Sequence, residues 1–388
     1  MTPKEIFDLI PDNIFEILQS KTEIDRKVHY LTGKIMFQLV LYSLITTNKG
    51  SLRVMETIFN SVRFKNWTQA DDAGRKRMTK YNSIYARICS IDSHYFSKLF
   101  DECYDLFQKQ INKAGSKGPK ILRFDSTMVA ASGKLMKIGM KVGSKTDKKQ
   151  IKFSIGFDGL MPRSGQIFTE QQHLSEDITL RKAILDSTVA KDEIVVFDRG
   201  VQKRSTYEEF SQNLISFVTR VNTSTQYTVV ENLVIPSDNG DECEIISDQM
   251  VRLYDSKKRA IKNPLRLVVI SASNTGNQYW FLTNIREMTA KEIAEIYKRR
   301  WDIEVFFKFL KQELNFSHLV AGNENGIRVM MYISLITAML IEVYKYFNKL
   351  KGYKIAKLKF SLEMEEELIK QIVIMCGGDP SKLIVPTG

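Results

Sequence analysis

The chain of 388 residues is long enough for two or three domains around a sizeable core. Its 57 Lys and Arg residues outnumber its 45 Asp and Glu residues, and the net charge of +12 favours a polyanionic partner, with nucleic acid ranked before an anionic membrane. The four cysteines are scattered without CxxC spacing, which argues against a zinc site and against a disulfide framework.

Neither a membrane span nor a secretion signal is predicted. The longest apolar run, residues 329–341, stops at Glu342 and is shorter than the ~18–20 residues needed to cross a bilayer. The N-terminus carries no signal-peptide pattern. We therefore expect a soluble protein of the cytoplasm without a membrane partner.

The first 113 residues have helical periodicity and few β-rich runs, which predicts an α-helical N-terminal domain. Thr2 to Glu5 matches a capping box with Pro at the first helical position. Helices are expected over 33–47 and 51–62, with a Gly turn between them, and a long helix over 82–113. The helix pair is compatible with a DNA-reading unit as well as with a purely structural bundle. Three cations lie on or near the second helix of the pair: Arg53, Arg63 and Lys65.

A linker at 112–120 precedes a change to strand periodicity. A strand over 121–125 ends in Asp125, alternating residues at 136–142 and 151–157 predict two antiparallel strands, and a helix is expected over 177–190. A buried strand over 193–198 ends in Asp198, and the last strand covers 217–221. This order of strands and helices predicts an RNase H-like domain with a mixed sheet.

Residues 222–285 contain short β-rich runs separated by turns, and we interpret them as a β insertion within the catalytic domain. Apolar-periodic helices over 326–350 and 358–374 follow as a cap on the core, and they are also a candidate dimer surface. The predicted fold is thus α+β or α/β. Its predicted domains are a helical DNA-binding domain (1–113), an RNase H-like domain (114–345) and a C-terminal helical region (346–388).

Residues 297–311, between the insertion and the C-terminal helices, contain no Pro or Gly and are predicted to form one α-helix. At about 100° per residue, Tyr297, Arg300, Glu304 and Lys311 fall within about 60° of one another. The adjoining sector is apolar and consists of Ile296, Ile303, Phe307, Leu310 and Leu314. Such a helix either exposes solvated charges or turns one carboxylate, flanked by cations and a phenol, toward a cleft.

Asp125, Asp198 and Glu304 can form a carboxylate cluster, because strand ends project side chains to one edge of a sheet. Clustered carboxylates repel one another and would take up protons unless cations neutralise them. Hard divalent cations prefer oxygen ligands, and two of them about 3.5–4 Å apart stabilise the attacking and leaving oxygens of phosphoryl transfer. Taken singly, each aspartate is more often a turn residue.

The pattern Tyr-x2-Arg-x3-Glu-x6-Lys resembles the signature of bacterial DDE transposases of the insertion-sequence-four family. The resemblance implies that Asp125, Asp198 and Glu304 bind two Mg²⁺ ions, for which Mn²⁺ can substitute. It implies that phosphates of the transposon end are held by Tyr297, Arg300 and Lys311. An aromatic residue of the insertion, Tyr279 or Trp280, would stack on a flipped base. Arg199 is a further candidate DNA contact, although Val201 stands where the family often has an aromatic residue.

The function implied by this resemblance is cut-and-paste transposition of an insertion sequence. Mg²⁺-dependent cleavage at the inverted repeats would proceed through a hairpin, and strand transfer into target DNA would follow. Implied partners are double-stranded DNA and a second copy of the chain in a synaptic homodimer, in a bacterial cytoplasm close to the nucleoid. Two alternatives stay open: a metal-dependent nuclease of the same fold, and a domesticated DNA-binding protein without catalysis.

Overall fold

The computed structural model describes residues 1–47, 50–112, 120–143, 149–235, 243–255, 257–272 and 276–383. The chain forms two compact units. A helical unit comprises Met1–Ser116, Ala130–Ile138 and Lys308–Gly388, and a sheet unit comprises Lys117–Val129 and Gly139–Phe307. The C-terminal helices thus share a unit with the N-terminal helices. The functional boundaries expected near residues 113 and 345 stay a prediction.

The helical unit is built around one long apolar helix, α13, which contacts helices from both ends of the chain. Thr2 forms the predicted capping box with Glu5. The helices of this unit are α1 (Pro3–Phe7), α2 (Asp12–Thr22), α3 (Gly33–Thr46), α4 (Leu52–Phe59), α5 (Val62–Trp67), α6 (Asp72–Lys76), α7 (Tyr81–Ser90), α8 (Ser93–Asn112), the 3-10 helices η1 (Gly133–Lys137) and η3 (Pro380–Lys382), α13 (Glu324–Phe347) and α14 (Tyr353–Met375).

The central helix α13 is long and apolar enough to cross a membrane by length and composition alone. However, 83% of its most apolar 18-residue stretch is buried inside the protein, and the core helix of a folded domain passes the same test of length and composition. Glu342 within it is 1% exposed and pairs with Lys345. We therefore interpret α13 as the core helix of the helical unit.

Two of the predicted N-terminal helices are interrupted. The expected helix over 51–62 ends at Phe59, and Ser61 caps a new helix, α5. The expected long helix over 82–113 breaks at Ile91, whose extended backbone ends α7 before α8 begins at Ser93. Both breaks follow from polar residues of turn type, Asn60-Ser61 and Asp92-Ser93, that compete with the helix for backbone hydrogen bonds.

The sheet unit contains one mixed sheet with strand order β2-β3-β1-β5-β6-β10-β9-β8-β7, with β4 paired to β3. β1 pairs with β5, and β5 with β6, in parallel, whereas β3 and β4 are antiparallel. The order β4-β3-β1-β5-β6 is the RNase H-like core that the sequence predicts. Its strands are β1 (Lys120–Ala130), β2 (Met140–Lys141), β3 (Lys149–Phe157), β4 (Pro162–Phe168), β5 (Glu193–Phe197) and β6 (Ser216–Val221).

The predicted β insertion is not a separate module, because its strands continue the same sheet. β10 pairs antiparallel with β6, so the insertion is attached along the edge of the RNase H-like core. The two runs expected at 245–246 and 251–254 are one strand with a register shift between Ile245 and Ser247. Its strands are β7 (Tyr227–Asn232), β8 (Cys243–Leu253), β9 (Leu265–Ala272) and β10 (Gln278–Thr283). The turn predicted at 238–240 lies outside the described residues.

Two strand predictions in the core are wrong. The run at 136–142 is mostly the 3-10 helix η1, and only Met140–Lys141 pair with β3. The third strand of the core is instead β4, which the sequence analysis missed because Pro162 and Gly165 break its alternation. β1 does not end at Asp125 but continues to Ala130.

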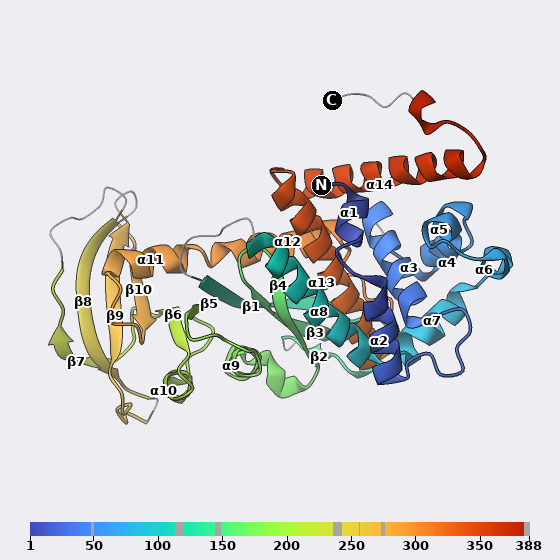
Figure 1. Ribbon diagram of the computed structural model, residues 1–388. Coiled ribbons are helices and arrows are strands. Elements are labelled where there is room, and N and C mark those ends of the chain that lie inside the picture. Colours follow the sequence, from blue (N-terminus) through green and yellow to red (C-terminus); the bar gives the residue numbers. More distant parts are fainter. Residues whose placement is uncertain are drawn as a thin grey trace. The chain divides into compact units, whose positions relative to one another are not determined.

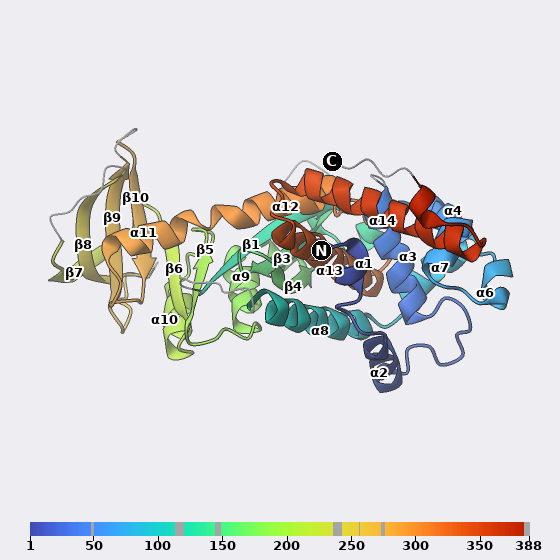
Figure 2. The same cartoon turned by 45° about the horizontal axis from the view of Figure 1, so that its top comes forward.

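Helices cover both faces of the sheet, which gives the sheet unit three layers (Figures 1 and 2). On one face, residues of α9 (Glu176–Leu185) and α10 (Arg204–Gln212) pack into a core with Phe124, Phe197 and Phe217. On the other face, α11 (Ala290–Lys298) packs against Val196 and Val218. The short η2 (Gln171–Leu174) precedes α9, which ends at Leu185 rather than near residue 190 as expected.

The segment 297–311 is not one continuous helix. α11 ends at Lys298 and α12 runs over Trp301–Glu313, with Arg299 and Arg300 in a turn between them. The backbone N–H of Ile303 donates to the carbonyl of Arg300 at 3.2 Å, three residues back, which tightens the chain locally. The apolar sector is buried as predicted, from Ile296 through Leu314.

Candidate active site

Asp125 and Asp198 are neighbours because of the parallel pairing of β1 with β5. The last paired residues of that ladder are Phe124 and Phe197, and each aspartate is the next residue in its chain. Each carboxylate accepts a hydrogen bond from the following backbone N–H, at 2.8 Å from Ser126 and 2.7 Å from Arg199. The two acids are thus held side by side at the end of the ladder, as the sequence predicted.

Arg123 fixes the start of α12, which carries the third acid. This side chain is 4% exposed, and its Nε donates to the carbonyl of Arg299 at 3.0 Å while its Nη2 pairs with Asp302 at 2.8 Å. Its Nη1 donates to the carbonyl of Asp158 at 2.8 Å. Gly159 has φ +104, and a Cβ there would lie 2.6 Å from Arg123 Nη1, so glycine is required on both counts.

Arg300 lies between the acids of the strands and the acid of the helix. Its Nη2 donates to Glu304, and its Nη1 is 3.6 Å from Oδ2 of Asp125. The hydroxyl of Tyr297 donates to Asp198 at 3.3 Å, and the Arg300 guanidinium lies 5.9 Å from the centre of the Tyr297 ring. Five of the predicted site residues therefore meet in one cluster within the sheet unit.

The electrostatics of the cluster are dominated by burial of negative charge. Burial raises the pKa of Asp125 to about 6, with further upward contributions from the charges of Glu176 and Asp198. The Ser126 N–H and the Arg300 guanidinium act in the opposite direction. Burial and the nearby Asp198 carboxylate raise the pKa of Tyr297 to about 12, which keeps its hydroxyl a donor at neutral pH. Burial thus disfavours the ionised form of Asp125 more than the Ser126 N–H and the Arg300 guanidinium favour it.

Glu176 is a fourth carboxylate near Asp125 that the sequence analysis missed. Glu176 lies at the start of α9, accepts a hydrogen bond from Ser126 Oγ at 3.0 Å and forms an ion pair with Lys152 at 2.9 Å. Lys152 is 2% exposed and also donates to the carbonyl of Leu174. No local signal marks Glu176, because an acidic residue in the first turn of a helix is common.

The donor set of the cluster fits a divalent cation of the hard kind, because all of its acids are carboxylates. In the described part of the chain, however, no group of three His, Cys, Asp or Glu side chains is close enough to share one ion. The Arg300 guanidinium occupies the space between Asp125 and Glu304 instead. If an ion binds here, Asp125, Asp198 and Glu304 are the residues to hold it.

The two aromatic candidates of the insertion face opposite sides of the sheet, as neighbouring strand residues must. Trp280 packs on the core beneath α9 and α10, with its ring 5.9 Å from that of Tyr227. Tyr279 lies on the face of α11 and Tyr297, and Arg220 lies 4.7 Å from the centre of its ring. Arg220 was missed in the sequence because an isolated arginine in a strand carries no signal.

The remaining predicted DNA contacts are Lys311 and Arg199. Lys311 is half-buried on α12 and belongs to the helical unit, and the Arg199 side chain is exposed. Val201, at the position where the family often has an aromatic residue, is buried in the core. Lys65 is not available to DNA, because its buried ammonium donates to the carbonyls of Arg75 and Arg77 at 2.7 and 2.8 Å.

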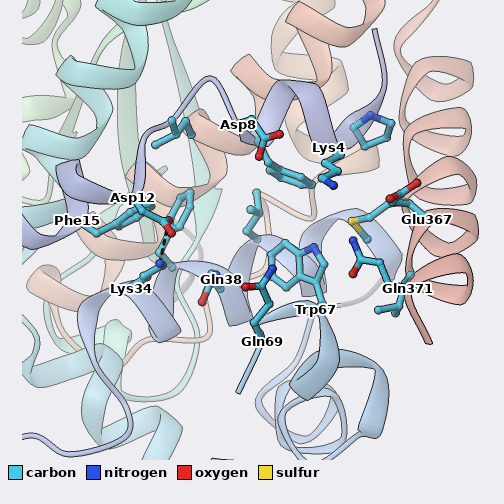
Figure 3. A pocket seen from close by; sticks show the side chains of 17 residues that line it. Lys4, Asp8, Asp12, Phe15, Lys34, Gln38, Trp67, Gln69, Glu367 and Gln371 are labelled. Atoms are coloured by element: carbon cyan, nitrogen blue, oxygen red, sulfur yellow. Dashed lines mark hydrogen bonds and ion pairs between the residues drawn. The ribbon is translucent and has the colours of Figure 1, made fainter. Parts of the chain in front are cut away.

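A separate pocket of about 180 Å³ lies in the helical unit, between α1, α2, α3, α14 and Trp67 (Figure 3). Three acidic and two basic side chains line it, and Lys34 pairs with Asp12 at 2.9 Å. This excess of acids does not favour a phosphate, so the pocket is not a second candidate for DNA.

Comparison with known proteins identifies the family of the chain. The family model described as "Transposase DDE domain" matches residues 116–340, more than half of the chain. A Sinorhizobium fredii transposase, y4zB, is 27% identical over 176 residues, 45% of this chain and 49% of that protein. A transposase for insertion sequence element IS4SA of Synechocystis is 33% identical over 89 residues, which are 21% and 26% of the two chains. A transposase for element IS5377 of Geobacillus stearothermophilus is 25% identical over 169 residues, 43% and 44% of the two.

These matches span half or less of each relative's own length. Among solved structures, the piggyBac transposase synaptic complex with hairpin DNA superposes with a TM-score of 0.49 and 12% identity over 100% of this chain and 83% of that one, too distant to add to the topology above. The family match contains the three acids and the whole Tyr297 to Lys311 signature. The chain belongs to the transposases with a DDE domain.

Proposed function

We propose that this protein is the transposase of an insertion sequence, which cuts DNA at the ends of the element and joins the ends to target DNA. The observation that supports this most directly is the meeting of Asp125 and Glu304 at the Arg300 guanidinium, with Asp198 beside Asp125 at the end of the β1–β5 ladder. Divalent cations at such carboxylates would supply charge stabilisation for the attacking and leaving oxygens of phosphoryl transfer.

The residues around the acids would bind and orient the DNA end. The Tyr297 hydroxyl, a donor at neutral pH, and the Arg300 guanidinium would hold phosphate oxygens beside the acids, which they contact in the free protein. Of the two aromatic candidates, Tyr279 is the better base-stacking residue, because it shares a sheet face with Tyr297 whereas Trp280 packs on the core. Lys311 and Arg199 are proposed as further phosphate contacts.

In the proposed reaction, water first attacks a phosphodiester at the element end and frees a 3′-OH. That hydroxyl then attacks the opposite strand to form a hairpin, which is reopened before the 3′-OH attacks target DNA. Each step breaks one phosphodiester bond, and the attacking group is either water or a DNA hydroxyl. The same acids would therefore serve in every step. Because two ends are joined, we propose a homodimer with bound DNA, acting on the DNA of a bacterial cytoplasm.

A metal-dependent nuclease of the same fold is the second candidate. It would need only the acids, so the adjacent Tyr297, Arg300 and the Arg220-supported Tyr279 favour the transposase. A domesticated DNA-binding protein would have no need for three acids gathered at one site.

The test is incubation of the purified protein with Mg²⁺ and labelled DNA carrying the inverted repeats that flank its gene. Products are separated on a denaturing gel. Cleavage at the repeat boundary with hairpin and joined products, absent in Asp125→Ala, supports the transposase. Nicking without sequence preference supports the nuclease, and binding without cleavage supports the domesticated protein.

A further inference from the structure

Arg300 touches the two carboxylates that a cation would need, and this position calls for an explanation of its own. Its guanidinium pairs with Glu304 and lies 3.6 Å from Asp125, with only 14% of the side chain exposed. The oxygens of Asp125 and Glu304 cannot bind this guanidinium and a divalent ion in the same way at the same time. The side chain is therefore a competitor for the metal ligands and not merely a neighbour.

The pairing of Arg300 is also incomplete. The 3.6 Å separation from Asp125 is too long for a hydrogen bond, and the buried Nε has no hydrogen-bond partner. A buried donor without a partner costs free energy that a better acceptor would recover. A phosphate accepts two parallel N–H groups from a guanidinium, so it could satisfy the donors that the carboxylates leave unpaired.

We propose that Arg300 is an internal counter-ion that holds the acids together before a divalent cation binds, and that it releases them when a DNA phosphate takes its guanidinium. This rests on the proposed function, because the phosphate is that of the DNA end. DNA and metal then bind with positive coupling: each one removes the guanidinium from the position where it opposes the other. Without DNA, the Arg300 guanidinium therefore weakens the binding of a divalent cation to the acids.

The first experiment measures the affinity for Mn²⁺ by electron paramagnetic resonance on the full-length protein without DNA. Arg300→Ala is expected to bind Mn²⁺ about tenfold more tightly than the wild type, within the usual range of coupling. Arg259→Ala is the control, because it removes one positive charge of the sheet unit whose ion-pair partner is Asp255 and not an acid of the site. We expect a change of less than about threefold for this control, since no pairing with the proposed metal ligands is lost.

The second experiment repeats the titration with a duplex carrying the inverted repeat. DNA should tighten Mn²⁺ binding by the wild type about fivefold or more and leave Arg300→Ala unchanged. Arg300→Gln replaces the alanine variant if that variant does not fold. An Arg300 variant that is folded by circular dichroism but binds Mn²⁺ no more tightly than the wild type overturns the proposal. Absence of DNA binding by the wild type overturns the proposed function instead, and the DNA-free comparison still decides the counter-ion role.

A different observation concerns α14, whose outer face is apolar. Ile355, Leu358, Leu362 and Ile369 are each about half exposed, and their spacing places them within about 60° around the helix. The opposite face of α14 is buried, with Phe360 among its core residues. A stripe at offsets of 3, 7 and 14 residues is the spacing that pairs helices side by side.

Charge along α14 indicates what covers this stripe. The first half of the helix carries the exposed Lys354 and Lys359, whereas Lys357 is buried; the middle carries the exposed Glu366, and Glu365 pairs with Arg63 of α5. Two copies of α14 in parallel would place like charges together, whereas an antiparallel pair places Lys359 of each beside Glu366 of the other. We infer that α14 is a contact surface for a second copy of this chain, paired antiparallel.

Sedimentation equilibrium of the full-length protein without DNA tests this surface, whether or not the chain cleaves DNA. The wild type is expected to dimerise and Leu362→Glu to be monomeric. Leu214→Glu, at an even more exposed leucine of the sheet unit, is the control and should leave the dimer intact. Lys359→Glu and Glu366→Lys should each weaken the dimer, and together restore it. A monomeric wild type, or a dimer that Leu362→Glu does not weaken, overturns the inference.

Discussion

Two arginines of the sheet unit, Arg266 and Arg300, lie beside carboxylates in a largely buried setting, and they differ in how fully they are paired. Arg266 and Asp248 join β9 to β8 with two hydrogen bonds, at 2.8 and 2.6 Å, and their side chains are 4% and 3% exposed. Arg266 Nη1 also donates to the carbonyl of Arg286 at 3.1 Å. Arg300 instead touches two carboxylates, reaches neither in that bidentate way and leaves its Nε without a partner.

This difference separates a structural ion pair from a functional one. A pair that satisfies all of its donors holds two strands together and has no capacity for a ligand. A pair that leaves donors unsatisfied and excess negative charge in place costs stability, and native proteins retain such costs mainly at sites that bind something. The Arg300 cluster has that second character, and this agrees with the family to which the chain belongs.

The largest expected effect comes from removing one partner of the fully hydrogen-bonded pair of Arg266 and Asp248. Asp248→Ala leaves the Arg266 guanidinium buried without its carboxylate, and we expect the free energy of unfolding to fall by about 3–5 kcal/mol. Urea unfolding followed by circular dichroism measures it. Asp192→Ala breaks an ion pair with Lys120 in which both side chains are more than 60% exposed, and it should cost far less because solvent screens the pair. Equal losses in the two variants would show that the buried pair is not special.

Removing a negative charge from the incompletely paired Arg300 cluster should instead raise the free energy of unfolding. The pKa of Asp125 is about 6 in the folded protein, above the 3.8 of an unperturbed side chain, so ionisation of Asp125 destabilises the fold as the pH rises through about 4 to 6. Asp125→Asn removes that penalty. We expect the metal-free variant to be more stable than the wild type at pH 8, by up to about 3 kcal/mol.

The sign of this effect is checked by unfolding both proteins at pH 4 and at pH 8. At pH 4 the wild-type carboxyl is protonated in the folded state, so the gain from Asp125→Asn should nearly vanish. A gain of the same size at both pH values would mean that the amide improves packing and that the charge of Asp125 is not the cause. A loss of stability at pH 8 would contradict the electrostatic account.

The smallest expected effect concerns Lys311, at the far end of the signature from Tyr297. If Lys311 holds a phosphate, Lys311→Ala should weaken DNA binding modestly and reduce the slope of log affinity against log salt by about one. Fluorescence anisotropy over a series of salt concentrations measures the slope. Lys308→Ala is the matched control on an exposed position of the same helix. An unchanged slope in Lys311→Ala would place this lysine away from phosphate.

The sequence predicts the acids of the sheet because their strands are marked by local pattern. The run Ile194 to Phe197 is continuously apolar and is buried on both faces, and the acid after it follows at once. The parallel pairing of β1 with β5 then brings Asp198 beside Asp125. The residues around Asp125 in the sequence do not by themselves predict this neighbour. Alternation of apolar residues in the sequence likewise marks β3, whereas Pro162 and Gly165 hide β4.

The remainder of the site depends on contacts between residues far apart in the chain. The break between α11 and α12 contains no Pro or Gly, and Arg123 contributes to it by binding the carbonyl of Arg299. Glu176 joins the acids because Ser126 and Lys152 hold it there. Neither contact has a counterpart in the periodicity of the sequence. The residue types of the site were therefore predictable, and the incomplete pairing of Arg300 was not.

The measurement that tests the central claim most directly compares Glu304→Gln with the wild type in DNA binding and cleavage of the inverted-repeat duplex. Glutamine keeps the size of the side chain and removes the charge that would bind a cation. We expect DNA binding within about threefold of the wild type and a loss of cleavage of at least about a hundredfold, the scale of removing one essential charged group. Cleavage by Glu304→Gln at the wild-type rate would contradict the account, because phosphoryl transfer would then take place elsewhere.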